Sequence, residues 1–256
     1  MTEEIYGEGW REILARNGLA DFDALWALHR QGWFEPPNRR RGGWSGVVRH
    51  ETMTETGEPV GLFVKFQEDH VYRSILHGFA PRATYDREFA NLRRFQAAGL
   101  PAPEWVYFGQ MRQEGHLRAI LVTRELHDYA PLDTLNPQEL SRPQRRVLLE
   151  TLARSAQRMH RHFIQHGSLY PKHIYYRFGA DGACDVRLID LERGRWHPCR
   201  RSIAIRDLSS LLRRVRHVYR RTEQLRFLLA YCDTSRLNPR AKSLAKAILR
   251  RIGTKD

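Results

Sequence analysis

Two short segments of the chain hold residue types that could do chemistry. Residues 166–174 combine two histidines, a serine and a lysine with glycine and proline, which break helices and leave polar groups on a loop. Residues 184–190 alternate like a strand, which places Asp190 on the same face as the apolar residues of that strand. A carboxylate there needs a cation or a donor, because an unpaired buried charge is costly. Asp190 therefore either caps a turn or pairs with an arginine, or it binds a ligand together with His173.

A third segment, residues 38–48, is rich in arginine and glycine. Three arginines, the last of them Arg41, are followed by Gly42 and Gly43, with Gly46 close behind. Glycines let a backbone approach phosphates closely, and arginines attract them. The segment matches neither the Walker nor the dinucleotide fingerprint. It is either an ordinary hairpin loop or a loop that covers phosphates.

Two charged side chains stand among apolar neighbours. Lys65 lies in the strand-like run 61–66, so it needs an anionic partner unless the strand is at an edge with the lysine in water. Glu88 borders the apolar face of a predicted helix over residues 83–98. An ion pair between Lys65 and Glu88 would satisfy both charges, and the alternative is a glutamate solvated at the helix edge.

The surrounding pattern predicts an α+β fold. Strand signals dominate up to residue 125 and helical signals dominate after residue 136, where Asn-Pro and Ser-Arg-Pro-Gln have the form of helix starts. We therefore expect an N-terminal lobe over residues 1–129, with a helical extension at its start, and a helical C-terminal lobe over residues 130–256. The predicted strands are residues 47–54, 59–67, 105–108 and 118–123, and the predicted helices are residues 21–29, 83–98, 141–160, 208–219 and 238–251.

The composition is that of a folded, basic protein. A hydrophobic fraction of 41% with 11% aromatic residues is typical of a globule, and the net charge of +14 favours anionic partners. Eleven arginines and no lysine occur between residues 193 and 226. Arginine binds phosphate bidentately, although a basic amphipathic helix can equally lie on an anionic membrane. Nucleic acid is not expected as a partner, because no known reading motif is present.

The three cysteines and the start of the chain indicate the compartment. The cysteines form neither a disulfide framework nor a zinc-binding pattern, so reduced thiols are expected. The first residues lack the pattern of a secretion signal, and no apolar run is long enough to span a membrane. We therefore expect a cytoplasmic protein.

In this order the segments resemble the protein-kinase-like fold, and in detail the lipopolysaccharide-core kinase family, which includes heptose kinases, Kdo kinases and InaA-type proteins. The resemblance covers roughly residues 20–230 and rests on the joint order of the motifs. It implies a bilobal fold, ATP and Mg²⁺ as cofactors, and phosphorylation of a sugar hydroxyl of the lipopolysaccharide inner core. The implied partners are the lipopolysaccharide core, or another anionic glycolipid, and ATP, with peripheral contact at the cytoplasmic face of the inner membrane.

The resemblance also implies roles for individual residues. His173 and Asp190 match the side chains that hold Mg²⁺, and Asp207 resembles the aspartate that braces the catalytic loop. The residues implied in nucleotide binding are Gly42, Gly43 and Ser45 in the phosphate-covering loop, Lys65 as the strand lysine, Glu88 as its helix partner, and Glu125 in the interlobe connector that would hold adenine.

The chain departs from the protein-kinase pattern at Ser168, which stands where the catalytic aspartate is expected. A serine does not accept a proton as a carboxylate does, yet phosphoryl transfer depends mostly on positioning and charge neutralisation. His166 or a phosphate of the substrate would then accept the proton, and Lys172 would steady the transferred group. The alternative is a pseudokinase that binds nucleotide or glycolipid without phosphoryl transfer.

Overall fold

The computed structural model describes residues 3–40, 42–73 and 80–253, and the chain divides into two compact units. The N-terminal unit comprises residues 1–93 and 103–127 and holds a large antiparallel sheet, and the C-terminal unit comprises residues 94–102 and 128–256 and is mainly helical. The predicted α+β fold, sheet-rich first and helical second, is confirmed. The lobe boundary after residue 129 stays a prediction.

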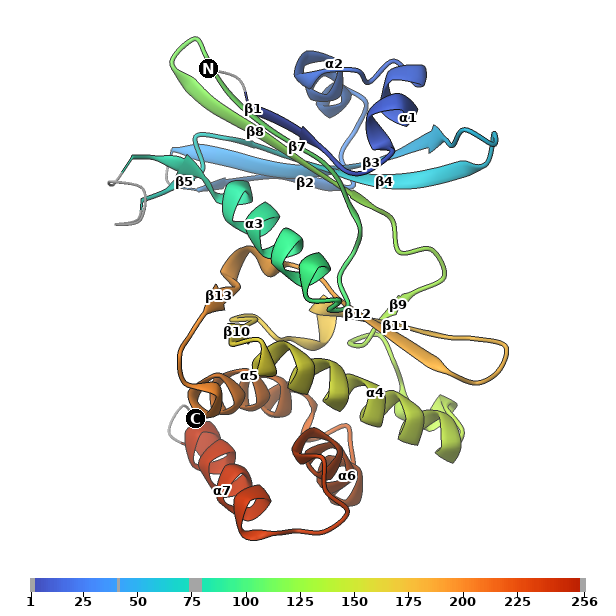
Figure 1. Cartoon of the computed structure of the whole chain (residues 1–256), viewed down its shortest axis with the longest axis vertical. Coiled ribbons are helices and arrows are strands. Elements are labelled where there is room, and N and C mark those ends of the chain that lie inside the picture. The colour runs from blue at the N-terminus through green and yellow to red at the C-terminus, as the bar shows by residue number, and fades with distance from the viewer. Residues whose placement is uncertain (1–2, 41, 74–79, 254–256) are drawn as a thin grey trace. The chain divides into compact units, whose positions relative to one another are not determined.

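The N-terminal unit is built on six antiparallel strands in the order β1-β7-β8-β4-β3-β2, with α1 and α2 on one face and α3 on the other (Figure 1). In β4, Val60, Leu62, Val64 and Phe66 are buried in the cluster that includes residues of α1 and α2. The alternation of a strand therefore turns Lys65 toward the face that carries α3. The elements are β1 (Glu3–Tyr6), α1 (Trp10–Arg16), α2 (Phe22–Ala27), β2 (Glu35–Arg40), β3 (Gly43–Met53), β4 (Pro59–Glu68), α3 (Thr84–Ala97), β7 (Trp105–Gln113) and β8 (His116–Arg124), with β5 (Val71–Tyr72) paired to β6 (Arg82–Ala83).

Local signals explain most of these elements. The Asp21 carboxylate accepts a hydrogen bond from the Ala24 amide at 2.9 Å and caps α2, as its type and position predict. Gly57, at φ 79°, provides the tight turn between β3 and β4. The pattern did not predict β2, since this strand contains two prolines and is exposed along its whole length.

The C-terminal unit consists mainly of helices, with short strands between them (Figure 1). The longest helix, α4, begins at a capping box between Ser141 and Gln144, as predicted. The helices bury alanines, leucines and isoleucines against one another, together with Tyr231. The elements are β9 (Ala130–Pro131), α4 (Arg142–Arg161), β10 (Ile164–Gln165), β11 (Ile174–Phe178), β12 (Cys184–Leu188), β13 (Arg195–Trp196), α5 (Arg200–Val215), α6 (Arg221–Cys232) and α7 (Pro239–Gly253).

Two helix predictions in this unit were incomplete. The structure begins α5 at Arg200, before the predicted residue 208, and it contains α6, which the sequence pattern did not separate from the arginine-rich stretch. Among the residues that the structure describes, no helix has the length and apolar character that crossing a membrane requires.

Candidate functional site

Lys65 and Glu88 form an ion pair within the N-terminal unit. The Lys65 Nζ lies 2.6 Å from a Glu88 carboxylate oxygen, and the side chains are 21% and 5% exposed. Because β4 lies between β8 and β3, Lys65 is not on an edge strand. The predicted ion pair is confirmed, and it holds the lysine amine at a fixed place above the sheet.

The glycine-rich segment forms the turn between β2 and β3 and the first residues of β3. Gly42 has φ 83°, a conformation that suits glycine, and Ser45 pairs with Asn38 of β2. At Gly43 a Cβ atom would lie only 2.5 Å from the carbonyl oxygen of Glu68. Close packing in the sheet thus explains why position 43 holds a glycine, independently of any contact with phosphates. Arg41 lies outside the described residues.

Glu125 lies in the predicted connector, and its side chain pairs with Arg49 of β3. Both of its carboxylate oxygens accept hydrogen bonds from Arg49, at 2.8 and 2.7 Å, and its backbone amide donates to the carbonyl of Gly61 at 2.8 Å. A Cβ atom at Gly61 would clash with the Glu125 side chain. The carboxylate is therefore committed to the sheet, so any contact with adenine would be made by the backbone.

Asp207 of α5 holds the first half of the 166–173 loop in place. The carboxylate accepts hydrogen bonds from the amides of His166, at 2.7 Å, and Gly167, at 3.1 Å. Asp207 is 1% exposed. Burial by itself raises its pKa, but the hydrogen bond and charge of His160 and the His166 amide outweigh burial and lower it. Asp207 is therefore an anion that braces the loop, as predicted.

His166 and Ser168 point into the protein. The His166 side chain is 0% exposed, and burial lowers its pKa, so the ring is neutral at pH 7. Its Nε2 atom has no hydrogen-bond partner among the described residues, and its Nδ1 accepts from the Ser168 amide at 3.4 Å. Ser168 is also buried, whereas Lys172 is exposed. In this arrangement neither His166 nor Ser168 has direct access to a substrate.

His173 and Asp190 lie together at the end of the loop. The structure ends β12 at Leu188, so the prediction that Asp190 belongs to this strand was wrong. Asp190 has left-handed backbone angles, φ 58° and ψ 60°, which are rare for a residue with a Cβ and cluster at functional sites. This turn brings its carboxylate to 3.1 Å from the Nε2 atom of His173.

The hydrogen bonds of His173 show what this pair can hold. Its Nδ1 lies 2.8 Å from the Ser168 carbonyl oxygen, so Nδ1 must carry the proton and donate. Nε2 then either carries a second proton toward Asp190 or presents a lone pair beside a carboxylate, which requires a cation between them. Histidines that bind metals usually fix their other nitrogen in this way. The donor set fits a divalent cation, although the structure has no group of three or more such side chains within the described residues.

The sequence pattern did not predict two residues that support the loop. His160 of α4 and Tyr231 of α6 are buried behind Asp207, and the His160 Nε2 atom lies 3.2 Å from its carboxylate. A histidine near the end of an apolar helix face carries no special signal, because only the fold reveals that Asp207 lies beside it.

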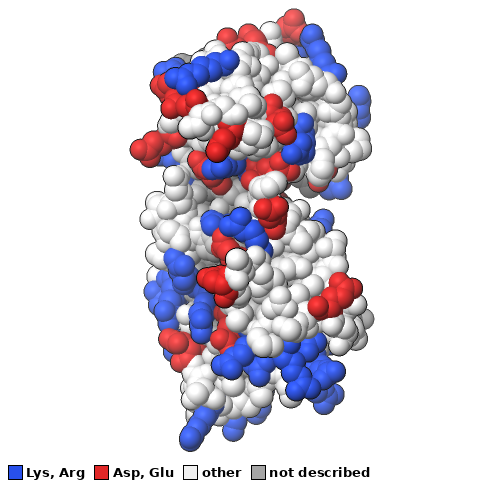
Figure 2. Space-filling model, turned by 90° about the vertical axis from the view of Figure 1, so that its right-hand side faces the viewer, with Lys and Arg blue, Asp and Glu red and all other residues white. Residues whose placement is uncertain are grey.

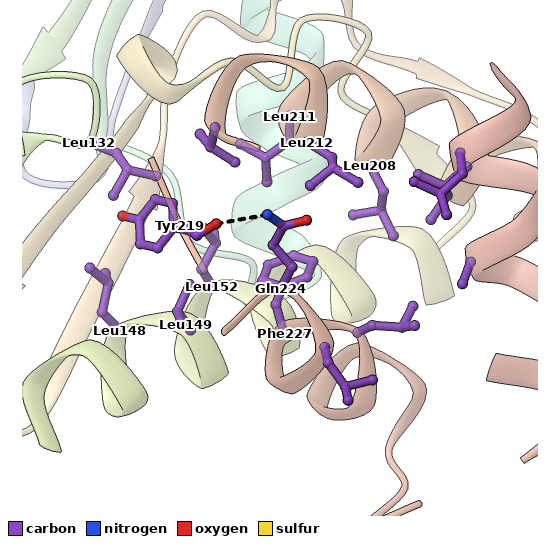
Figure 3. A pocket seen from close by; sticks show the side chains of 16 residues that line it. Leu132, Leu148, Leu149, Leu152, Leu208, Leu211, Leu212, Tyr219, Gln224 and Phe227 are labelled. Atoms are coloured by element: carbon purple, nitrogen blue, oxygen red, sulfur yellow. Dashed lines mark hydrogen bonds between the residues drawn. The ribbon is translucent and has the colours of Figure 1, made fainter. Parts of the chain in front are cut away.

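The C-terminal unit has a basic surface and an apolar cavity. Lys and Arg side chains gather on the face of this unit that Figure 2 shows. A groove of this unit is lined by arginines of α4 and of the start of α6, together with Glu223, which lies 3.5 Å from Arg145. The arginines of the groove are Arg142, Arg145, Arg146, Arg220 and Arg226. A cavity of about 180 Å³ lies among α4, α5, α6 and α7, where leucines of α4 and α5 surround it (Figure 3). The Gln224 amide beside it donates to the Tyr219 carbonyl at 2.8 Å, which leaves the lining almost entirely apolar.

Comparison with known proteins identifies the family. Residues 23–231 match the model of the lipopolysaccharide kinase (Kdo/WaaP) family. The chain is 31% identical to Protein InaA of Escherichia coli (strain K12) over 179 residues, which are 68% of this chain and 79% of that protein. A solved structure of WaaP in complex with acyl carrier protein has the same fold, with a TM-score of 0.68, 20% identity and coverage of 98% of both chains. Since the family match runs through both units and includes the loop and the ion pair described above, this chain belongs to the lipopolysaccharide kinase (Kdo/WaaP) family.

Proposed function

We propose that this protein phosphorylates a sugar hydroxyl of the lipopolysaccharide inner core, with ATP as the phosphate donor and a divalent cation, Mg²⁺ in the first instance. The observation that carries the proposal is the His173 and Asp190 pair, whose 3.1 Å contact and fixed imidazole proton suit a bound cation. Such a cation neutralises charge on the transferred phosphate. Family membership supports the same reaction class.

Residues of the N-terminal unit bind ATP in this proposal. Lys65 contacts the phosphates, and Glu88 orients Lys65 through the 2.6 Å ion pair. Gly42, Gly43 and Ser45 cover the phosphates with their backbone. The backbone at Glu125 contacts adenine, since the Glu125 carboxylate is paired with Arg49.

The C-terminal unit binds the acceptor. Because His166 and Ser168 are buried, we assign them to positioning the loop, and a phosphate of the substrate accepts the proton of the sugar hydroxyl. Lys172 is exposed and steadies the transferred group. The arginine groove binds the anionic glycolipid, and this attraction brings the protein to the cytoplasmic face of the inner membrane.

The first test compares wild type with Asp190→Ala and with Asp181→Ala, an exposed aspartate of the β11–β12 turn that serves as the matched control. ATP binding with and without Mg²⁺ is measured by calorimetry, and transfer is measured on purified lipopolysaccharide core that lacks only the phosphate of the acceptor sugar. We expect transfer by wild type and Asp181→Ala and none by Asp190→Ala. Full transfer by Asp190→Ala would refute the assignment.

The serine at position 168, where a catalytic aspartate is expected, favours a pseudokinase instead. If wild type binds ATP and transfers no phosphate to the core, then the chain is a nucleotide-binding protein without phosphoryl transfer.

The apolar cavity favours a second candidate function, the binding of an acyl group. An apolar cavity of this size accommodates an apolar ligand, and the solved WaaP structure contains an acyl carrier protein. Val215 lines the cavity, whereas the nearby Val218 is 48% exposed and does not. We expect Val215→Trp to weaken the binding of a fluorescent fatty acid at least about tenfold, because the indole fills the space, and Val218→Trp to leave it unchanged. Equal binding by both variants would exclude the cavity as the site.

A further inference from the structure

Tyr231, in the last turn of α6, contacts the support of the 166–173 loop from behind. Its side chain is 8% exposed, and its hydroxyl oxygen lies 2.8 Å from the Nδ1 atom of His160. The two rings meet edge to face, with centroids 5.7 Å apart. The phenol keeps its proton, because burial raises the pKa of Tyr231.

The hydrogen bonds form a continuous chain. The Asp207 carboxylate can only accept, so the Nε2 atom of His160, 3.2 Å away, donates to it. The other ring nitrogen, Nδ1, makes the 2.8 Å hydrogen bond with the Tyr231 hydroxyl. The same carboxylate accepts the amides of His166 and Gly167. Tyr231 is therefore the first member of a buried chain that ends at the backbone of the loop.

Tyr231 also belongs to the helix that forms a wall of the apolar cavity. Gln224, Phe227 and Leu228 line the cavity and precede Tyr231 by seven, four and three residues, so all four lie on one face of α6. The Tyr231 carbonyl accepts a hydrogen bond from Gln157 of α4 at 2.6 Å. A shift of α6 would move the hydroxyl away from His160.

We propose that Tyr231 is a positioning residue of the phosphoryl-transfer site, which ties the place of α6 to the backbone of His166 and Gly167 through His160 and Asp207. The effect of Tyr231 on catalysis rests on the proposed kinase function. The effect of Tyr231 on the loop does not, because the protection of the two loop amides can be measured whether or not phosphate is transferred.

The test is Tyr231→Phe, which removes one oxygen atom and keeps the ring. The matched control is Tyr176→Phe in β11 of the same unit, where the structure gives the hydroxyl no hydrogen bond to any described residue. Hydrogen exchange of the amides of His166 and Gly167 is followed in both variants, together with kcat and the KM for ATP.

We expect Tyr231→Phe to speed exchange at the two loop amides by about fivefold, the factor that follows from the loss of one hydrogen bond. The kcat should fall by a similar factor while the KM for ATP stays within about twofold, since the change is in loop placement and not in nucleotide contacts. Tyr176→Phe should change neither quantity.

A double variant tests whether Tyr231 acts through His160. In a His160→Gln background, Tyr231→Phe should add less than about twofold to loop exchange, because coupled residues are not additive. Unchanged loop exchange in Tyr231→Phe, or a rise spread evenly over all helices of the unit, would overturn the proposal. If wild type transfers no phosphate, the kinase proposal fails, while the exchange comparison still decides the role of Tyr231.

Discussion

Asp207→Asn is the sharpest test of how the loop is held. The change keeps the shape of the side chain but replaces an acceptor-only carboxylate by an amide, whose NH₂ group cannot accept. In the wild type, three donors converge on the carboxylate: the His160 ring and the amides of His166 and Gly167. At least one of these buried donors must lose its partner.

The expected loss of stability in Asp207→Asn follows from the burial of the carboxylate and the number of hydrogen bonds that it accepts. A hydrogen bond to a charged group contributes about 1.5–3 kcal/mol, so the loss of one to two such bonds destabilises by roughly 3 kcal/mol, after a discount for the lower cost of burying a neutral amide. For a chain of this size each kcal/mol shifts Tm by about 2–4 °C, so we expect a decrease of about 6–12 °C. Asp233→Asn is the control, because Asp233 is 78% exposed and its contact with Arg161 is 3.6 Å long.

The pKa of Asp207 also predicts how the stability difference between wild type and Asp207→Asn depends on pH. The pKa of Asp207 is lower in the folded protein than in the unfolded chain, so the unfolded chain binds the proton more readily. The stability from this carboxylate is thus complete above about pH 4 and is lost as the pH falls through the lower folded pKa. Thermal melts of wild type and Asp207→Asn should differ by the same amount at pH 7 and pH 5, and the difference should shrink below pH 4. A loss of Tm below about 2 °C, or a difference that vanishes between pH 7 and 5, would refute the reasoning.

Three further variants test the candidate site. Glu88→Gln should destabilise the chain by about 2–3 kcal/mol in urea titrations and weaken ATP binding, because it removes the negative charge of the 2.6 Å ion pair with Lys65, and unchanged stability would contradict this. Gly43→Ala should cost about 1–3 kcal/mol in the same titration because of the 2.5 Å approach, whereas Gly253→Ala, with open space around it, should cost almost nothing. His173→Asn should shift metal preference from Mn²⁺ toward Mg²⁺ in calorimetric titrations, because imidazole suits first-row transition metals and an amide oxygen suits Mg²⁺; an unchanged ratio would show that His173 is not a ligand.

The sequence predicts those features that depend on local signals. The helix caps at Asp21 and Ser141, the β3–β4 hairpin and the apolar face of α3 all follow from residues within a few positions of one another, and the structure confirms them. The Lys65 and Glu88 pair is also predictable, because each is a charge among apolar neighbours and so requires a partner.

Other features depend on contacts between distant segments. The left-handed turn at Asp190 was missed, because the predicted strand ran through residue 190 although the alternation of apolar and polar residues ends at Leu188. Likewise, Tyr231 and His160 are 71 residues apart, and neither carries a pattern that distinguishes it from ordinary core residues. The family resemblance assigned Glu125 to the connector that would hold adenine, whereas the partner of its carboxylate, Arg49, lies 76 residues earlier in the chain.

The interior positions of His166 and Ser168 bear on where the proton of the acceptor hydroxyl goes. If a phosphate group on the substrate accepts it, then the rate should rise with the second ionisation of that phosphate, near a pKa of about 6. The midpoint should be the same in wild type and in His166→Gln, because the buried ring takes no part in proton transfer. Single-turnover rates between pH 5 and 8 on a phosphorylated core measure this. A midpoint that moves or disappears in His166→Gln would assign the proton to His166, and would require the loop to open so that the ring becomes accessible.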